Sequence, residues 1–184
     1  CIASGNQEYI EICSDDEGGA IIAWHDIRNP PYCYIYAQRI NSNGDILWTT
    51  NGVPICVVEA SYWPDLCPDG AHGAIITWFD WRGGPDYNIY VQRVSSSGFI
   101  LWKTNGVLIC DATGLQQSPQ ICSDQYGGAI IVWEDYRNGN ADIYVQRVDS
   151  NGNILWTNNG VPICTANNLS LIHISEPTRP LYIS

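Results

Sequence analysis

The amino-acid sequence predicts an all-β fold of three four-stranded antiparallel repeats, which we interpret as β-propeller blades in an incomplete ring. Three observations support this. Marker residues recur at a nearly constant period, as with Trp48, Trp102 and Trp156, which are 54 residues apart, and periods of that size are typical of propeller blades. Short apolar or alternating runs are separated by turns rich in Gly, Asn and Asp. No segment shows the 3.6-residue apolar period of an amphipathic helix.

The repeats define the expected domain. We place the domain at residues 1–168, with repeats at 1–55, 56–109 and 110–163 and the start of a fourth at 164–168. Three blades rarely close a propeller, so we expect the chain to be part of a ring of about six to eight blades. We therefore expect the remaining blades of a parent chain, or other copies, to complete the ring. The alternative is a closed threefold β-trefoil, whose repeats are usually shorter.

Four strands are expected in each repeat, and in the third they are residues 119–122, 129–133, 143–148 and a segment opening at 153–156. The second is a continuous apolar run, which is typical of a strand buried on both faces. The third alternates with the two-residue period of a strand, and Asn151-Gly152 supplies the tight turn that follows it. Pro162, in the segment 161–164, fits an edge strand because proline donates no ladder hydrogen bond.

Residues 169–184 break the pattern. A fourth repeat would place its second cysteine near position 175 or 176, which hold Ser175 and Glu176. The string LSLIHISEPTRP resembles the translated read-through of a sequencing adapter. We therefore interpret 169–184 as a non-native tail, with a divergent native tail as the alternative.

Composition restricts the partners. The net charge is −11 and the chain has only 8 Lys and Arg residues, whereas phosphate contacts need clustered basic side chains. We therefore expect no nucleic acid partner. No apolar run approaches the roughly 18 residues of a membrane-spanning helix, so we also expect no membrane span.

Cysteine spacing predicts disulfides. The chain has 8 cysteines, and six of them form one pair per repeat: Cys1–Cys13, Cys56–Cys67 and Cys110–Cys122. There is no CxxC motif and the histidines do not recur with the cysteines, so we expect disulfides and no metal site. Such bridges would place the protein in an oxidising compartment, secreted or at the cell surface. Cys33 and Cys164 are expected to be unpaired or to bridge to another chain.

A Trp-x-Asp-x-Arg motif occurs in every repeat. We interpret it as structural, because a half-buried Asp and Arg need one another as partners. The alternative is a substrate clamp. Catalytic acids and bases need different environments, and three identical motifs offer only one, so we expect no catalytic residues and no enzyme activity. The motif residues are Trp24, Asp26, Arg28, Trp78, Asp80, Arg82, Trp133, Asp135 and Arg137.

Ligand binding is expected where the repeats differ. Tyr62 and Trp63 precede Cys67, while Trp81 and Tyr136 stand between the repeated Asp and Arg. Exposed aromatic side chains stack on sugar rings or anchor protein partners. These four residues are therefore the candidate site for a glycan or a surface protein, and the alternative is that they cover a neighbouring blade.

Acidic turns offer a second candidate site. They lie at residues 14–19, 68–70 and 123–128. Calcium needs about six to eight oxygen ligands, and none of these turns has the spacing of a known calcium loop. We expect no cofactor, with calcium as the alternative.

The third repeat reads GGAIIVWEDYRNG, then DIYVQRVDSNGNILW. It resembles repeats in large secreted or surface proteins of environmental bacteria, which are distantly similar to sialidase and TolB-like propellers. The resemblance implies an extracellular scaffold, adhesion or binding module and names no catalytic residue. Ser150 stands where the sialidase Asp-box has Asp, which argues against sialidase activity. The alternatives are a carbohydrate-binding module, a fragment of a sialidase-like glycoside hydrolase, and a subunit of an extracellular assembly.

Overall fold

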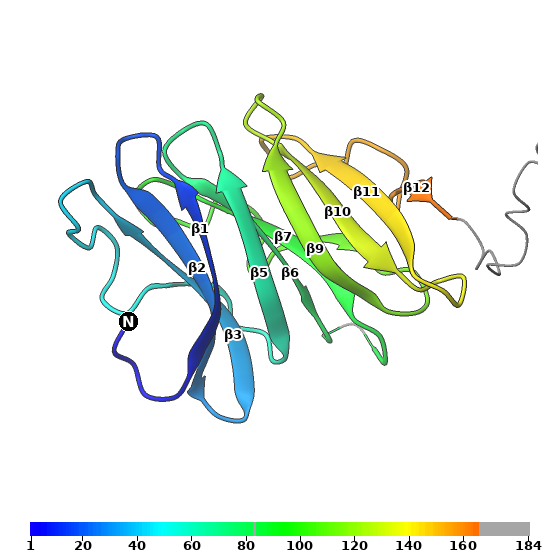
Figure 1. The fold of residues 1–184 in the computed structure, drawn as a ribbon, viewed down its shortest axis with the longest axis horizontal. Coiled ribbons are helices and arrows are strands. Elements are labelled where there is room, and N and C mark those ends of the chain that lie inside the picture. The colour runs from blue at the N-terminus through cyan, green and yellow to red at the C-terminus, as the bar shows by residue number, and fades with distance from the viewer. Residues whose placement is uncertain (83, 166–184) are drawn as a thin grey trace, which may run out of the picture.

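The computed structural model describes residues 1–82 and 84–165, and it confirms the predicted fold class. The described residues form three four-stranded antiparallel sheets and no helix. Figure 1 shows the sheets side by side along the chain. The expectations for residues 169–184, and for 166–168 of the expected fourth repeat, lie outside the described residues.

Each sheet consists of four strands that neighbour one another in sequence order. The first sheet contains β1 (Gln7–Ser14), β2 (Ala20–Asn29), β3 (Tyr32–Ile40) and β4 (Val53–Cys56). The second contains β5 (Ser61–Pro68), β6 (Ala74–Asp80), β7 (Asn88–Val94) and β8 (Val107–Cys110). The third contains β9 (Gln116–Ser123), β10 (Ala129–Asp135), β11 (Asp142–Val148) and β12 (Val161–Cys164).

The sheets pack face to face, with β1 adjacent to β5 and β5 adjacent to β9 (Figure 1). One apolar cluster fills the space between the first and second sheets, and another fills the space between the second and third. The described sheets do not close into a barrel, so the β-trefoil alternative is wrong.

The fourth strand of each repeat lies later than predicted. In the third repeat it is β12, whereas residues 153–156 make only the isolated bridge between Val148 and Ile154. The reason is a side chain: the Trp156 amide donates to Gln146 Oε1 at 3.0 Å and not to a strand carbonyl. Cys164, like Cys56 and Cys110, therefore ends a sheet and does not begin the next repeat.

The predicted disulfides are wrong, because all eight cysteines lie in the described part of the chain and are free. Cys56 Sγ lies 3.4 Å from Ser61 Oγ at the start of β5. Cys67 lies six residues further along that strand, or about 20 Å at the usual strand rise. A disulfide needs a Cα separation of about 4–7 Å. The same separation along the inner strand excludes the pairs Cys1–Cys13, Cys56–Cys67 and Cys110–Cys122.

We expect thiol titration of the denatured protein, without reductant, to find all eight cysteines as thiols. Reducing agent should leave the melting temperature unchanged, since no covalent cross-link constrains the unfolded chain. In the native protein Cys110 should react slowly with alkylating agents, because burial raises the pKa of its thiol to about 12 and the thiolate is the reactive form. A melting temperature that falls on reduction would contradict this arrangement.

Within residues 1–82 and 84–165, no helix is long and apolar enough to cross a membrane.

Candidate binding site

The Trp-x-Asp-x-Arg motif forms one buried network in each sheet. In the second sheet, Asp80 is fully buried and accepts hydrogen bonds from Trp78 Nε1 at 2.9 Å and Arg82 Nε at 2.9 Å. Arg82 also donates to the Asn105 carbonyl at 2.7 Å, and its guanidinium lies 3.8 Å above the Tyr90 ring centre. The equivalent networks contain Trp24, Asp26 and Arg28, and Trp133, Asp135 and Arg137.

The Asp26 and Asp135 carboxylates are held in the ionised form, because their pKa values are lowered. Burial alone would raise the pKa of Asp26 and of Asp135, but hydrogen bonds from the neighbouring Arg and Trp outweigh burial and lower both values. Each carboxylate thus uses its acceptor positions within the sheet. A general acid needs the opposite shift.

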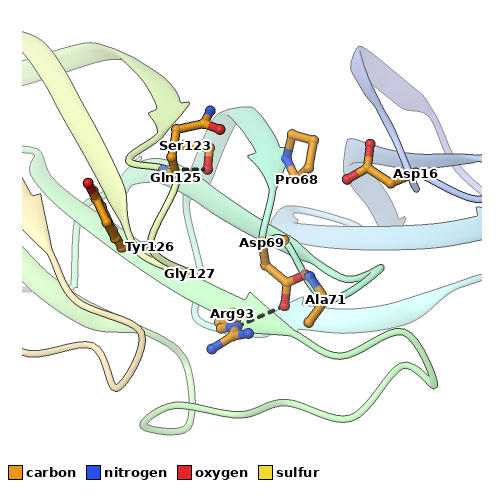
Figure 2. A pocket seen from close by; sticks show the side chains of 10 residues that line it. Asp16, Pro68, Asp69, Ala71, Arg93, Ser123, Gln125, Tyr126 and Gly127 are labelled. Atoms are coloured by element: carbon orange, nitrogen blue, oxygen red, sulfur yellow. Dashed lines mark hydrogen bonds and ion pairs between the residues drawn. The ribbon is translucent and has the colours of Figure 1, made fainter.

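The acidic turns are also bound internally. Asp69 Oδ1 accepts hydrogen bonds from the amides of Ala71 and Gly73, each at 2.8 Å, and Asp69 Oδ2 accepts from Arg93 Nε at 2.8 Å. Figure 2 shows this pair beside a cavity of about 640 Å³ that also reaches Tyr126. Asp15 with Arg39 and Asp124 with Arg147 repeat the arrangement. No cluster of three or more His, Cys, Asp or Glu within the described residues is arranged to hold a metal ion.

A second cavity, of about 500 Å³, lies at the opposite end of the strands and is largely aromatic. Trp63 stands edge-on to Phe79 with ring centres 5.4 Å apart, and Tyr62 contacts Phe79 at 5.9 Å. Tyr87 closes the cluster at 5.0 Å from Phe79, and Tyr9 of β1 lies 5.6 Å from Trp63. The first and second sheets therefore build one aromatic surface, which we call the aromatic cavity.

The aromatic cavity is built from equivalent places of the repeats that carry different residues. Strand pairing puts Glu8 opposite His25 in the first sheet, as Tyr62 lies opposite Phe79 in the second. In the third sheet these two places are Gln117 and Glu134. Positions that the repeats share thus support the sheets, while positions that vary among them meet at this cavity.

β-Bulges shape the floor of the cavity. Tyr9, Trp63 and Ser118 occupy the same place in β1, β5 and β9, and all three have positive φ, at 51°, 46° and 53°. Strand pairing shifts at each of these places. Bulges re-aim side chains, and strained backbone concentrates at functional sites. Here they leave Tyr9 and Trp63 exposed beside the small Ser118.

His25 is the unusual polar group of the cavity. It is 4% exposed, and neither ring nitrogen has a hydrogen-bond partner among the described residues. The imidazole stacks on Tyr9 at 5.5 Å and meets the edge of Tyr62 at 5.3 Å. Burial lowers the pKa of His25, although Glu8 and Asp26 act in the opposite direction. His25 is thus buried in its neutral form.

Two of the four predicted ligand residues line this cavity, and the other two contact residues that line it. Tyr62 and Trp63 line it, and Trp81 packs on Tyr87 with ring centres 5.8 Å apart. Tyr136 Oη lies 3.5 Å from Nε2 of Gln117, which also lines the cavity. Among the residues that the sequence interpretation missed are four with aromatic rings, Tyr9, His25, Phe79 and Tyr87.

The two remaining cysteines are in different places. Cys33 is buried and lines the aromatic cavity, whereas Cys164 is exposed at the end of β12. Comparison of the chain with protein-family models, curated proteins and solved structures finds no match.

Proposed function

We propose that this chain is a non-catalytic binding module of a β-propeller and that its aromatic cavity binds a carbohydrate. One observation carries the proposal: the places at which the repeats differ converge on a cavity with exposed aromatic rings. Aromatic faces stack on the C–H faces of sugars, and their polar edges accept or donate hydrogen bonds. On a scaffold or adhesion protein, such a module recognises a glycan surface.

The charges of the cavity favour neutral or amino sugars over acidic ones. Glu8 and Gln117 line it, and none of the ten lining residues is Lys or Arg. An acidic sugar would meet the Glu8 carboxylate without a compensating cation. A neutral sugar instead finds acceptors for its hydroxyl groups in these two side chains.

The burial and hydrogen bonding of the three motif aspartates favour binding over hydrolysis. Glycoside hydrolases use two carboxyl groups that flank the scissile bond, and Asp26, Asp80 and Asp135 are each buried and bonded to Trp and Arg. The extracellular location proposed for the module depends on the repeat resemblance alone, because the cysteines are free and do not indicate an oxidising compartment.

The double variant Trp63→Ala/Trp81→Ala tests the proposal. A glycan array on the wild type identifies a ligand, and calorimetry compares the affinities. Trp63 lines the cavity, and Trp81 packs on Tyr87, which also lines it. At about 0.5–1.5 kcal/mol for each aromatic contact, the loss of both should weaken binding roughly 5- to 150-fold. The matched control is Phe99→Ala, because Phe99 is an exposed aromatic residue of the same repeat outside the cavity.

Two results would oppose the proposal. Equal glycan binding by the wild type and the double variant would remove the aromatic cavity as the site. Turnover of a fluorogenic sugar panel that is lost in Asp80→Asn would instead support the glycoside hydrolase alternative.

A further inference from the structure

The two internal interfaces between sheets share one set of polar contacts. At the first, Trp48 Nε1 and Arg39 Nη1 both donate to the Ser96 carbonyl, at 2.9 and 3.0 Å. One sheet thus provides two donors and the next provides the carbonyl of a turn. The second interface repeats this with Trp102, Arg93 and Ser150.

The first and third sheets each have one side of this contact without a partner sheet among the described residues. Trp156 and Arg147 occupy the donor places of the third sheet, and no sheet follows the third among the described residues. Ser42 occupies the acceptor place of the first sheet, which no described sheet precedes. The third sheet therefore presents donors, and the first presents the matching carbonyl.

Apolar side chains show the same relation. Ile55 and Ile109 are each 2% exposed at the internal interfaces, while Ile163, in the same place of the third sheet, is 64% exposed. On the opposite face, Leu66 is 6% exposed and its equivalent in the first sheet, Ile12, is 64% exposed. Both outer faces thus expose residues that the internal interfaces bury.

A tryptophan socket is open on the first sheet. A Cβ atom at Gly98 would lie 3.0 Å from the Trp48 ring, and one at Gly152 would lie 2.9 Å from the Trp102 ring. At Gly44, the equivalent glycine, such an atom would meet nothing within 4 Å. The internal interfaces therefore specify what fits against the first sheet, namely the tryptophan face of another sheet of this repeat.

We propose that a second copy of this chain supplies the tryptophan face that packs against the first sheet. The third sheet of each copy packs on the first sheet of the other, with Trp156 over Gly44 and with Trp156 and Arg147 donating to the Ser42 carbonyl. Propellers close with about four to eight blades. The described residues of one copy supply three blades, those of two copies supply six and those of three supply nine, so only two copies fall within that range. A head-to-tail contact of this kind closes into a ring when its rotation permits.

The two N-terminal residues lie on the surface where the second copy docks, so they must move for docking to occur. Cys1 Sγ lies 3.8 Å from Arg28 Nη2, and the Ile2 amide donates to Asn51 Oδ1 at 3.0 Å. Cys56 makes the matching contact with Arg82 inside the chain. Cys1 thus holds the place that Cys164 of the second copy takes, and docking displaces the exposed residues Cys1 and Ile2.

Sedimentation of the full chain tests the proposal, with a dimer as the expected result. Ile12→Lys and Ile163→Lys each alter a side chain that is exposed in the single chain, so both variants should fold, and each should be monomeric. Mixing the two variants should restore a dimer, because the mixture retains one unaltered pair of faces. Phe99→Lys is the matched control, since Phe99 is exposed on the middle sheet and its variant should dimerise.

Four outcomes would overturn the proposal. They are a monomeric wild type, growth beyond the dimer into filaments, a dimer that persists in either single variant, and a chain that dimerises only without residues 166–184. The third would indicate pairing of like faces. The last would identify the removed segment as the occupant.

Discussion

Replacing Asp80 with alanine should lower the free energy of unfolding by about 3–5 kcal/mol, the usual cost of leaving one member of a buried ion pair without its partner. The Asp80 carboxylate accepts hydrogen bonds from Trp78 Nε1 and from the Arg82 side chain, and it is fully buried. Its removal leaves the indole N–H without an acceptor and a largely buried guanidinium without its carboxylate, although Arg82 keeps the Asn105 carbonyl. Urea unfolding followed by tryptophan fluorescence measures the change.

Asp111→Ala is the matched control for Asp80→Ala. Asp111 is exposed, so its replacement should change stability by less than about 0.5 kcal/mol. If Asp80→Ala unfolded at the same urea concentration as this control, the network would not hold the second sheet together. In that case the repetition of Trp, Asp and Arg would need another cause, and substrate binding would again be the leading one.

The sheets were predictable because their determinants are local. Alternation of side chains specifies a strand such as β11, and a Gly-rich turn specifies the hairpin that joins β9 to β10. The fourth strand was misplaced for a reason that composition does not show. Gln146 Oε1 accepts the Trp156 amide, and this side-chain acceptor diverts the segment at 153–156 from the ladder.

The disulfide prediction was wrong for a related reason. Spacing in sequence does not give separation in space, and a strand places residues six apart about 20 Å from one another. Cys56, the last residue of β4, lies beside Ser61 at the start of β5, whereas Cys67 lies near the end of β5. If the segment between Cys56 and Cys67 were a loop, the same spacing in sequence would have permitted a disulfide between them.

The candidate site was half predictable. Tyr62 and Trp63 stood out because they interrupt the repeat, and both line the cavity. Tyr9 was missed even though it has the same phase as Trp63, a signal that aligning the inner strands would have given. His25 needed knowledge of the strand pairing that puts it opposite Glu8, because a lone histidine after Trp24 carries no sign of the residues around it.

Replacing His25 with phenylalanine should stabilise the protein. Phe79 already holds the equivalent place in the second sheet, so the ring should keep its contacts with Tyr9 and Tyr62. The substitution removes two buried nitrogens that have no hydrogen-bond partner among the described residues. An unsatisfied buried polar group costs about 1–3 kcal/mol, and we expect a gain in that range near neutral pH.

The stability that His25→Phe gains over the wild type should increase as the pH falls. Burial lowers the pKa of His25 in the folded protein, with Glu8 and Asp26 opposing, while the unfolded value is about 6.5. Below about 6.5 the unfolded chain therefore binds more protons at this position than the folded chain does, and wild-type stability declines. His25→Phe lacks this loss, so the difference between variant and wild type should be larger at about pH 5 than at about pH 8.

Urea unfolding at both pH values measures the difference, and His72→Asn is the matched control. The His72 side chain is about half exposed and its backbone has a positive φ of 63°, which asparagine tolerates better than most residues. His72→Asn removes a half-exposed imidazole and leaves His25 in place, so it shows how the rest of the protein responds to acidification. A gain for His25→Phe that stays constant from about pH 8 to about pH 5 would mean that the folded and unfolded chains bind protons equally at His25, with the imidazolium donating to a hydrogen-bond acceptor in the folded state. The aromatic cavity would then open to water around His25, and ligand hydroxyl groups would reach its ring nitrogens.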